Sequence, residues 1–233
     1  IINDGPLSFN ANQTGSQLWE PKNFDGKYDG PVRMRTALVK SKNLVSIRIL
    51  QAIGVHYAQD YISRFGFDAD RHPAYLPMAL GSGSVTPMQM AVGYSVFANG
   101  GYRIAPYFIK KIEDEKGNVL EQFQPVSTSN GAKRVIDPRN AFIMTNMMQD
   151  VINFGTAVKA KQLGRTDLAG KTGTTSNYID AWFCGYQKNL VTISWMGYDE
   201  PKSLGSNETG GRVALPIWMD YMKSVMKDVP MVD

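Results

Sequence analysis

The sequence is poor in the residues that build disulfides and zinc sites. Its 233 residues include one cysteine, Cys184, and two histidines, His56 and His72. One cysteine allows no disulfide within the chain, and one thiol with two imidazoles cannot supply the four ligands of a usual structural zinc site. We therefore expect no metal and no cofactor. A triad of serine, histidine and aspartate would depend on one of these two imidazoles.

Charge of one sign and long apolar runs are also scarce. The net charge is only +4, and the basic residues are scattered among acidic ones, so we do not expect nucleic-acid binding. Residues 73–102 carry no formal charge, but prolines and glycines interrupt them, which excludes a membrane-spanning helix of about 20 apolar residues. Because the first residue is Ile1, we expect the chain to belong to a longer protein.

Apolar periodicity and stop residues predict several helices in the first two thirds of the chain. Residues 1–30 are polar and are expected to form surface loops. Helices are predicted for residues 31–39, 44–53, 58–65, 86–98 and 137–154, and a hairpin for residues 107–112 with 119–123.

The last third of the chain has a strand pattern. Three strands are predicted at residues 168–174, 180–186 and 190–198, and their short connections favour an antiparallel meander. A closing helix at 215–225 has an apolar face that suits packing on this sheet. The sequence therefore predicts the α/β class, more narrowly α+β, with an antiparallel sheet flanked by helices.

The segment Lys171-Thr172-Gly173-Thr174 ends the first predicted strand. A strand places the two threonines on one face, with Lys171 and Gly173 on the other. Two hydroxyls and an ammonium suit a substrate carboxylate, and Gly173 lets another backbone approach. At a sheet edge, an extended peptide could pair with this strand. Taken alone, the segment is equally consistent with an ordinary strand that is closely packed at Gly173.

A phosphate-binding loop is the rival interpretation, since it too contains Gly-Lys-Thr. That loop needs a glycine five positions before Gly170, where Arg165 stands. It must also lead into a helix, whereas a strand pattern follows here. We therefore set the nucleotide-binding interpretation aside.

A second segment, Ser41-Lys42-Asn43, lies between two predicted helices. Ser41 and Asn43 can both face a cleft, where one relays a proton and the other bonds an amide. Such a pair can also simply cap a helix. Ser8-Phe9-Asn10 matches the same short pattern, so the pattern alone is weak evidence.

Together the two segments resemble the second and third active-site motifs of penicillin-binding proteins and serine β-lactamases. The wider sequence resembles class A penicillin-binding proteins, in particular the penicillin-binding protein 1A type, from about Trp19 to Lys223. Five segments carry this resemblance in the family's order: residues 37–54, 79–87, 97–101, 171–183 and 210–218.

The resemblance implies a transpeptidase fold and a D,D-transpeptidase that cross-links peptidoglycan stem peptides and is acylated by β-lactams. It implies that Ser41 relays a proton toward the leaving nitrogen, that Asn43 holds the substrate amide, and that Lys171 supplies positive potential. Thr172 and Thr174 would bind the substrate or antibiotic carboxylate. The Thr174 N–H would be half of the oxyanion hole.

The same substrate-binding segment includes Gly173 and Thr175. Lys42 occupies the variable middle position of its motif, and we assign it no catalytic role.

The sequence departs from the family at the nucleophile motif, Ser-x-x-Lys. Residues 1–40 contain no match, and Ser224-Val225-Met226-Lys227 comes too late in the chain. We expect residues 1–233 to be the C-terminal portion of the domain, inactive alone, with its nucleophile in the missing upstream part. By resemblance, a glycosyltransferase domain and a membrane anchor precede it, on the periplasmic side of the inner membrane.

Two alternatives remain at this point. The same fold could serve a β-lactamase or a D-Ala-D-Ala carboxypeptidase, which transfer the acyl group to water. The missing nucleophile also leaves open a non-catalytic module that binds cell-wall peptides.

Overall fold

The centre of the molecule is an antiparallel sheet of three strands. The computed structural model describes residues 1–232. The strands are β7 (Ala169–Thr174), β8 (Ala181–Gln187) and β9 (Leu190–Met196), in the order β7-β8-β9. Their antiparallel register confirms the predicted meander. Within residues 1–232, β7 pairs with β8 alone and so forms an edge of this sheet.

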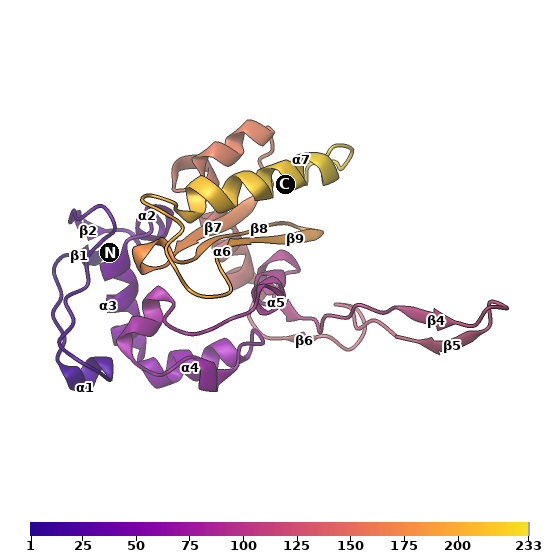
Figure 1. Ribbon diagram of the computed structural model, residues 1–233, viewed down its shortest axis with the longest axis horizontal. Coiled ribbons are helices and arrows are strands. Elements are labelled where there is room, and N and C mark those ends of the chain that lie inside the picture. The colour runs from indigo at the N-terminus through magenta and orange to yellow at the C-terminus, as the bar shows by residue number, and fades with distance from the viewer. Residues whose placement is uncertain (233) are drawn as a thin grey trace.

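Helices cover both faces of the sheet, as the sequence predicts (Figure 1). Helix α7 (Leu215–Val225) buries Trp218 on one face, with its ring 4.9 Å from that of Phe183. On the other face, Tyr186 packs with side chains of α5 (Pro87–Ala98) and α6 (Pro138–Phe154). The mixed arrangement of helices and antiparallel sheet is confirmed.

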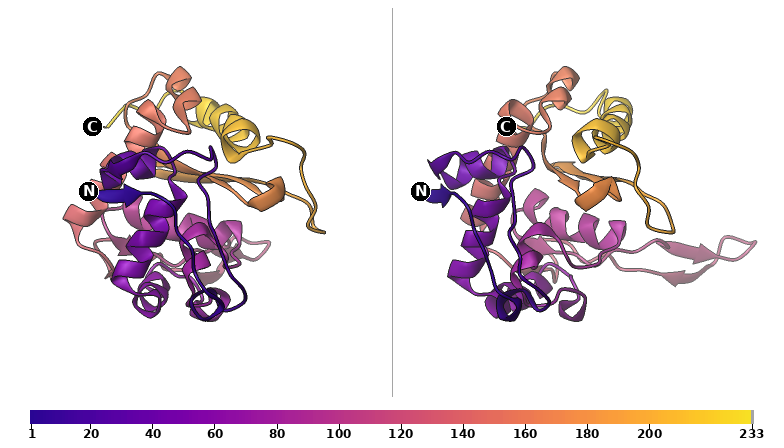
Figure 2. Two further views of the ribbon diagram at one scale, coloured as in Figure 1. Left: turned by 90° about the vertical axis from the view of Figure 1, so that its left-hand side faces the viewer. Right: turned by 60° about the vertical axis from the view of Figure 1, so that its left-hand side comes forward.

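A second, helical half lies beneath the sheet (Figure 2). It contains α2 (Met34–Val39), α3 (Asn43–Ile53) and α4 (Val55–Ser63), with the 3-10 turns η1 (Ala69–Arg71) and η2 (Leu76–Leu80). A core of its own joins α3, α4 and η2 to the N-terminal segment: Phe9, Leu44, Ile47, Leu50 and Leu76. Val39 of α2 belongs instead to the core that contains Trp218. Helix α5 connects this half to the sheet, because its Tyr94 packs against Tyr186 of β8 and its Phe97 packs against Phe65, which follows α4.

The N-terminal segment contains more regular structure than its composition suggests. Strand β1 (Ile2–Asp4) pairs with β2 (Gly30–Val32), and a short helix, α1 (Ala11–Thr14), lies between them. The helix predicted for residues 31–39 therefore begins only at Met34. Proline fits a first helical turn, but pairing with a strand some thirty residues away decides the conformation of Pro31.

Local start signals predict the other helices well. Helix α5 begins after Thr86, which forms a reciprocal capping box with Gln89. Helix α6 begins at Pro138 behind the cap Asp137. The helix predicted for residues 58–65 begins earlier, at Val55, and ends at Ser63.

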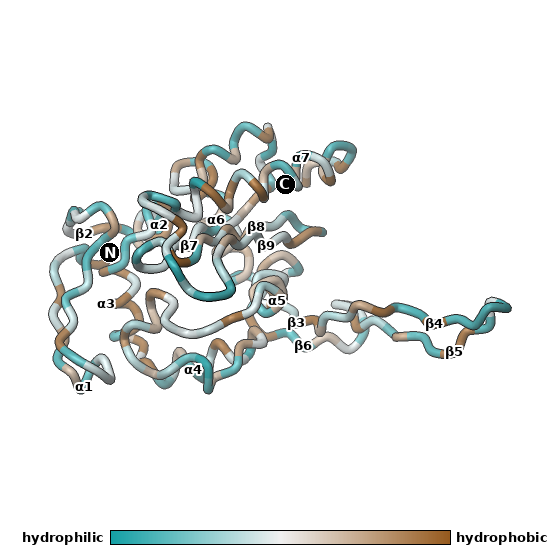
Figure 3. The backbone as a smooth tube through the Cα atoms, in the orientation of Figure 1, coloured by the Kyte–Doolittle hydropathy of each residue, from teal (hydrophilic) through white to brown (hydrophobic). Residues whose placement is uncertain are grey.

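A long hairpin arm projects from the body (Figure 1). It is formed by β4 (Lys111–Glu113) and β5 (Val119–Gln122), as predicted, with a shorter ladder. At its base, β3 (Tyr102–Arg103) pairs with β6 (Lys133–Arg134). Both apolar and polar stretches occur along the arm (Figure 3).

The remaining elements are short turns. They are the 3-10 turns η3 (Val158–Leu163) and η4 (Ser176–Tyr178) and the π-helical turn η5 (Gly210–Ala214). Among residues 1–232, no helix has the length and apolar character needed to cross a membrane.

Candidate active site

Ser41 lies in the tight turn between α2 and α3. The Ser41 N–H donates to Leu38 O at 3.1 Å, and the Lys42 N–H donates to Ala37 O at 2.9 Å. These two bonds form a Schellman motif, whose residue after the helix cap adopts the left-handed conformation. Glycine usually occupies that place, yet Ser41 holds it with φ of 56°. Such a conformation costs a non-glycine residue about 1–2 kcal/mol.

Lys171 projects from the edge strand β7 toward this turn. Its Nζ donates to Ser41 Oγ at 2.8 Å and to Thr172 O at 3.1 Å. The two segments singled out in the sequence therefore meet, although 130 residues separate them. Burial lowers the pKa of Lys171 from 10.5 to about 8. The amine thus remains mostly protonated at neutral pH but titrates at mildly alkaline pH.

The two threonines of the segment form hydrogen bonds to neighbouring elements. Thr172 Oγ1 lies 2.6 Å from Thr156 Oγ1, at the turn after α6. Thr174 Oγ1 accepts the Gly210 N–H at 3.0 Å, at the start of η5. A hydroxyl that accepts one such bond keeps its own proton for another partner. The Thr174 hydroxyl can therefore donate to a carboxylate.

Gly210 approaches the strand very closely. A Cβ at this position would overlap the carbonyl oxygens of Trp182 and Gly173, well inside van der Waals contact. A Cβ at Gly173 would instead meet the side chain of Trp182, at 3.2 Å, so the close approach of the two backbones depends on Gly210. This packing seats η5 directly on the end of β7.

The remaining residues of the two motifs have other neighbours. Asn43 begins α3, and its Nδ2 donates to Lys22 O at 2.9 Å. Among the described residues, none donates a hydrogen bond to its Oδ1, which can therefore accept one from a substrate. The Thr175 hydroxyl accepts the Asp180 N–H at 2.7 Å, so it closes the loop after β7. The structure therefore brings Ser41, Lys171, Thr172 and Thr174 together and directs the Thr175 hydroxyl into that loop.

The late Ser-x-x-Lys match has an ordinary helical environment. The Ser224 hydroxyl is exposed and donates to Asp220 O, one turn back in α7, at 3.2 Å. It has no hydrogen bond to Lys171 or Ser41 among the described residues. This arrangement matches the exposed helical turn that its position in the sequence suggests.

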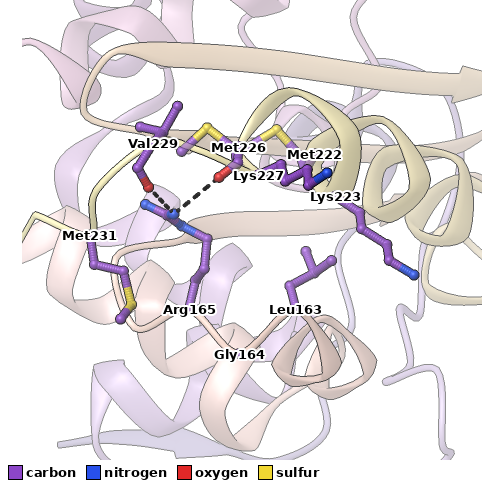
Figure 4. A pocket seen from close by; sticks show the side chains of 9 residues that line it. All are labelled: Leu163, Gly164, Arg165, Met222, Lys223, Met226, Lys227, Val229 and Met231. Carbon is purple, nitrogen blue, oxygen red and sulfur yellow. Dashed lines mark hydrogen bonds between the residues drawn. The ribbon is translucent and has the colours of Figure 1, made fainter.

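A cavity of about 310 Å³ lies beside α7, and none of its lining residues belongs to this site (Figure 4). Arg165 crosses it, donates to Val229 O at 2.6 Å and pairs with Asp167 at 2.7 Å. These partners take up the hydrogen-bond donors of the guanidinium. We therefore interpret the cavity as a gap in the packing between η3 and the C-terminal segment. Its lining residues are Leu163, Gly164, Arg165, Met222, Lys223, Met226, Lys227, Val229 and Met231.

Sequence reasoning missed Thr156 and Gly210 as parts of this site. Thr156 follows the end of a helix, and Gly210 precedes the start of one. Both therefore look like ordinary residues at helix boundaries. Only their long-range contacts with Thr172 and Thr174 reveal their place. Among residues 1–232, no group of three or more His, Cys, Asp or Glu residues is arranged to hold a metal ion.

Comparison with known proteins identifies relatives across the whole chain. The transpeptidase family described as "Penicillin binding protein transpeptidase domain" matches residues 2–223. Penicillin-binding protein 1A of Neisseria lactamica is 51% identical over 230 residues, covering 99% of this chain and 29% of that protein. The Pseudomonas aeruginosa penicillin-binding protein 1A is 42% identical, covering 99% of this chain and 34% of that protein. The chain thus spans about a third or less of these relatives.

Solved structures show the same architecture. The crystal structure of penicillin-binding protein 1A from Haemophilus influenzae matches with a TM-score of 0.92 at 34% identity, covering 100% of this chain and 39% of that one. PonA1 from Mycobacterium tuberculosis in complex with penicillin V matches with a TM-score of 0.80 at 23% identity, covering 100% and 64%. The second match shows a shared fold.

Proposed function

The chain belongs to the family of penicillin-binding protein transpeptidase domains, and on that premise we propose that it forms the substrate-recognition side of a peptidoglycan D,D-transpeptidase. The observation that carries this proposal is the 2.8 Å bond between Lys171 Nζ and Ser41 Oγ. Each motif alone is a common sequence pattern. Joined at one strand edge, they supply a cation, a proton-relaying hydroxyl and carboxylate-binding hydroxyls.

The proposed reaction is acyl transfer between stem peptides. A serine of the parent protein, in a Ser-x-x-Lys motif that we place before Ile1, attacks the carbonyl of the penultimate D-alanine. The tetrahedral intermediate then expels the terminal D-alanine, whose nitrogen must gain a proton. Ser41 relays to that nitrogen the proton that the attacking serine gives up, and its hydroxyl is oriented by the Lys171 ammonium. An amine of a neighbouring stem peptide then displaces the serine and completes the cross-link.

Substrate recognition is assigned to β7 and the start of α3. The edge of β7 offers backbone groups to an extended stem peptide, as in strand addition. Thr172 and Thr174 donate to the terminal carboxylate, and Gly173 keeps the strand surface open. The Thr174 N–H provides one oxyanion donor, and Asn43 Oδ1 accepts a substrate amide. Thr175 supports the end of this strand through its bond to Asp180.

The parent protein is proposed to be a class A penicillin-binding protein. We infer that an upstream glycosyltransferase domain and a membrane anchor precede this domain, and that it faces the periplasm from the inner membrane. β-Lactams acylate the same serine in this proposal. The penicillin V complex of PonA1, which shares the fold, supports that choice of ligand.

Reaction of the parent protein with a fluorescent penicillin tests this function. We expect one adduct per chain and slow release, because a transpeptidase must protect its acyl-enzyme from water. Hydrolysis with a kcat above roughly 1 per second, within the range of ordinary enzymes, would identify a β-lactamase instead. With peptide substrates, cross-linked dimers support transpeptidation, whereas release of D-alanine without dimers identifies a carboxypeptidase.

A further inference from the structure

Lys42, between Ser41 and Asn43, extends toward three carboxylates, of which Asp4 is buried, while the side chains of Asp25 and Asp29 are 51% and 29% exposed. The Lys42 side chain is 3% exposed, and that of Asp4 is 0% exposed. The Lys42 Nζ lies 3.2 Å from Asp4 Oδ2 and 3.4 Å from one oxygen each of Asp25 and Asp29. An ammonium has three N–H donors, and three carboxylates face them here.

Asp4 connects this cluster to the beginning of α3. Its Oδ1 accepts Asn23 Nδ2 at 2.7 Å, and its Oδ2 accepts the Asp29 N–H at 2.9 Å. Asn23 Oδ1 in turn accepts the Leu44 N–H at 3.3 Å. One polar network therefore joins β1, the loop of residues 22–29 and the first turn of α3.

The same network reaches both neighbours of Lys42. Loop residue Lys22 accepts the Asn43 side chain through its carbonyl. On the other side, the Lys42 N–H closes the strained turn at Ser41. A charged anchor thus lies between the two residues that are proposed to face the substrate.

The neighbouring carboxylates favour the protonated, positively charged form of Lys42. Burial is the largest influence on Lys42 and acts to lower its pKa, yet the hydrogen bond and charge of Asp4 and the charges of Asp25 and Asp29 raise it overall. Replacing one partner of a buried pair leaves an uncompensated charge, while the intact pair often contributes little net stability over apolar residues. The cluster's place beside the site therefore suggests a role in geometry.

We propose that Lys42 is a positioning residue, which acts through Asp4, Asp25 and Asp29 to hold the Ser41 hydroxyl and the Asn43 amide in place for acylation. This inference rests on the proposed function. It assigns Lys42 no contact with the substrate.

The test compares the two lysines on either side of Ser41, in the full-length parent protein. Lys42→Met keeps most of the aliphatic stem and removes the charge. Lys40→Met is the matched control, because Lys40 also pairs with Asp29, at 2.9 Å, but its side chain is 53% exposed. The readouts are the acylation rate constant for a fluorescent penicillin, counted per folded protein, and the affinity of the complex before acylation.

We expect Lys42→Met to slow acylation at least roughly tenfold, since small misplacements of reacting groups can cost about a hundredfold. Affinity before acylation should change less than about threefold, because the two threonines are intact, and Lys40→Met should stay within about twofold in both quantities. If Lys42→Met matches Lys40→Met, or loses affinity alone, the proposal is wrong.

Asp4→Asn provides a second, nearly isosteric test from the other end of the pair. It should slow acylation as well, and combining it with Lys42→Met should add little, since both act through one contact. Full additivity of the two effects would contradict the proposal. This variant also decides the matter if Lys42→Met does not fold.

Hydrogen exchange at residues 38–44 separates this inference from the proposed function. If the parent protein does not react with penicillin, the function fails, but positioning is still measurable. Faster exchange at residues 41–44 in Lys42→Met, and not in Lys40→Met, is the result we expect. Unchanged exchange in both variants would overturn the positioning role.

Discussion

Ser41 occupies a backbone position that glycine fills more easily. Its φ of 56° and the two bonds that close the turn explain why the chain reverses here between two helices. A serine is retained where glycine would relieve strain, and its hydroxyl meets Lys171. Strain that persists at a site of this kind is consistent with function.

The strained backbone of Ser41 and the proposed role of its hydroxyl can be separated by two substitutions, which should affect stability differently and acylation alike. Ser41→Ala and Ser41→Gly both remove the hydroxyl, so both should slow acylation in the parent protein to a similar extent. Ser41→Gly should be more stable than Ser41→Ala by about 1 kcal/mol, because glycine tolerates positive φ. Thermal unfolding measures the difference. Equal melting temperatures would show that the turn stores no such strain.

The lowered pKa of Lys171 predicts that the rate of acylation depends on pH. Burial lowers its pKa to about 8, so the ammonium is lost as pH rises through that value. Acylation should decline with an inflection near pH 8, and Lys171→Ala should lower the rate at neutral pH by roughly 10²–10³-fold and abolish the inflection. Lys188→Ala, in the exposed turn after β8, is the control. A loss below about threefold for Lys171→Ala would place the reaction elsewhere.

The effect of Lys171 on stability has the opposite sign. Its folded-state pKa of about 8 lies below the ordinary value of 10.5. Between these two values the unfolded chain binds more protons than the folded chain. The contribution of this residue to stability therefore rises with pH across that window.

Helices and strands with strong local signals follow the sequence closely. The capping box at Thr86 and the cap at Asp137 begin their helices as predicted. Pro31 has an equally good local signal, but pairing with β1 overrides it. Local chemistry predicts helix starts, whereas strand pairing depends on residues far away in the chain.

The contact of η5 with β7 is another such long-range feature. Gly210 touches the backbone of β7 and donates to Thr174, a contact that the resemblance of residues 210–218 to the family does not reveal by itself. Its tight packing holds the threonine hydroxyl at the strand edge. The element therefore acts as a support for the proposed carboxylate site.

Gly210→Ala should be destabilising and should weaken penicillin acylation. The added Cβ would overlap the carbonyls of Trp182 and Gly173, and overpacking of this kind costs about 1–3 kcal/mol. Gly5→Ala is a suitable control, because the three atoms nearest its Cβ would all belong to the side chain of Asn3 and not to backbone. Thermal unfolding and the acylation rate check both effects. Unchanged values for Gly210→Ala would show that η5 can move away from β7 without loss.

Across the whole molecule, the sequence identifies the two segments of the proposed site. It does not predict the contacts that bring these segments together. Resemblance to penicillin-binding proteins gives the fold and the two motifs, and the family comparison confirms the membership. The carboxylate cluster around Lys42 has no counterpart in the sequence reasoning. Its members, Asp4, Asp25 and Asp29, are scattered in a segment interpreted as loops. Only folding brings their charges to one lysine.

We propose that this chain carries two active-site segments that work with a serine located upstream. Intact mass of this chain, and of the parent protein, after exposure to a reactive penicillin tests it most directly. We expect one adduct on the parent protein and none on residues 1–233 alone. An adduct on the short chain would show that one of its own serines, Ser224 included, is the nucleophile, and that no upstream serine is needed.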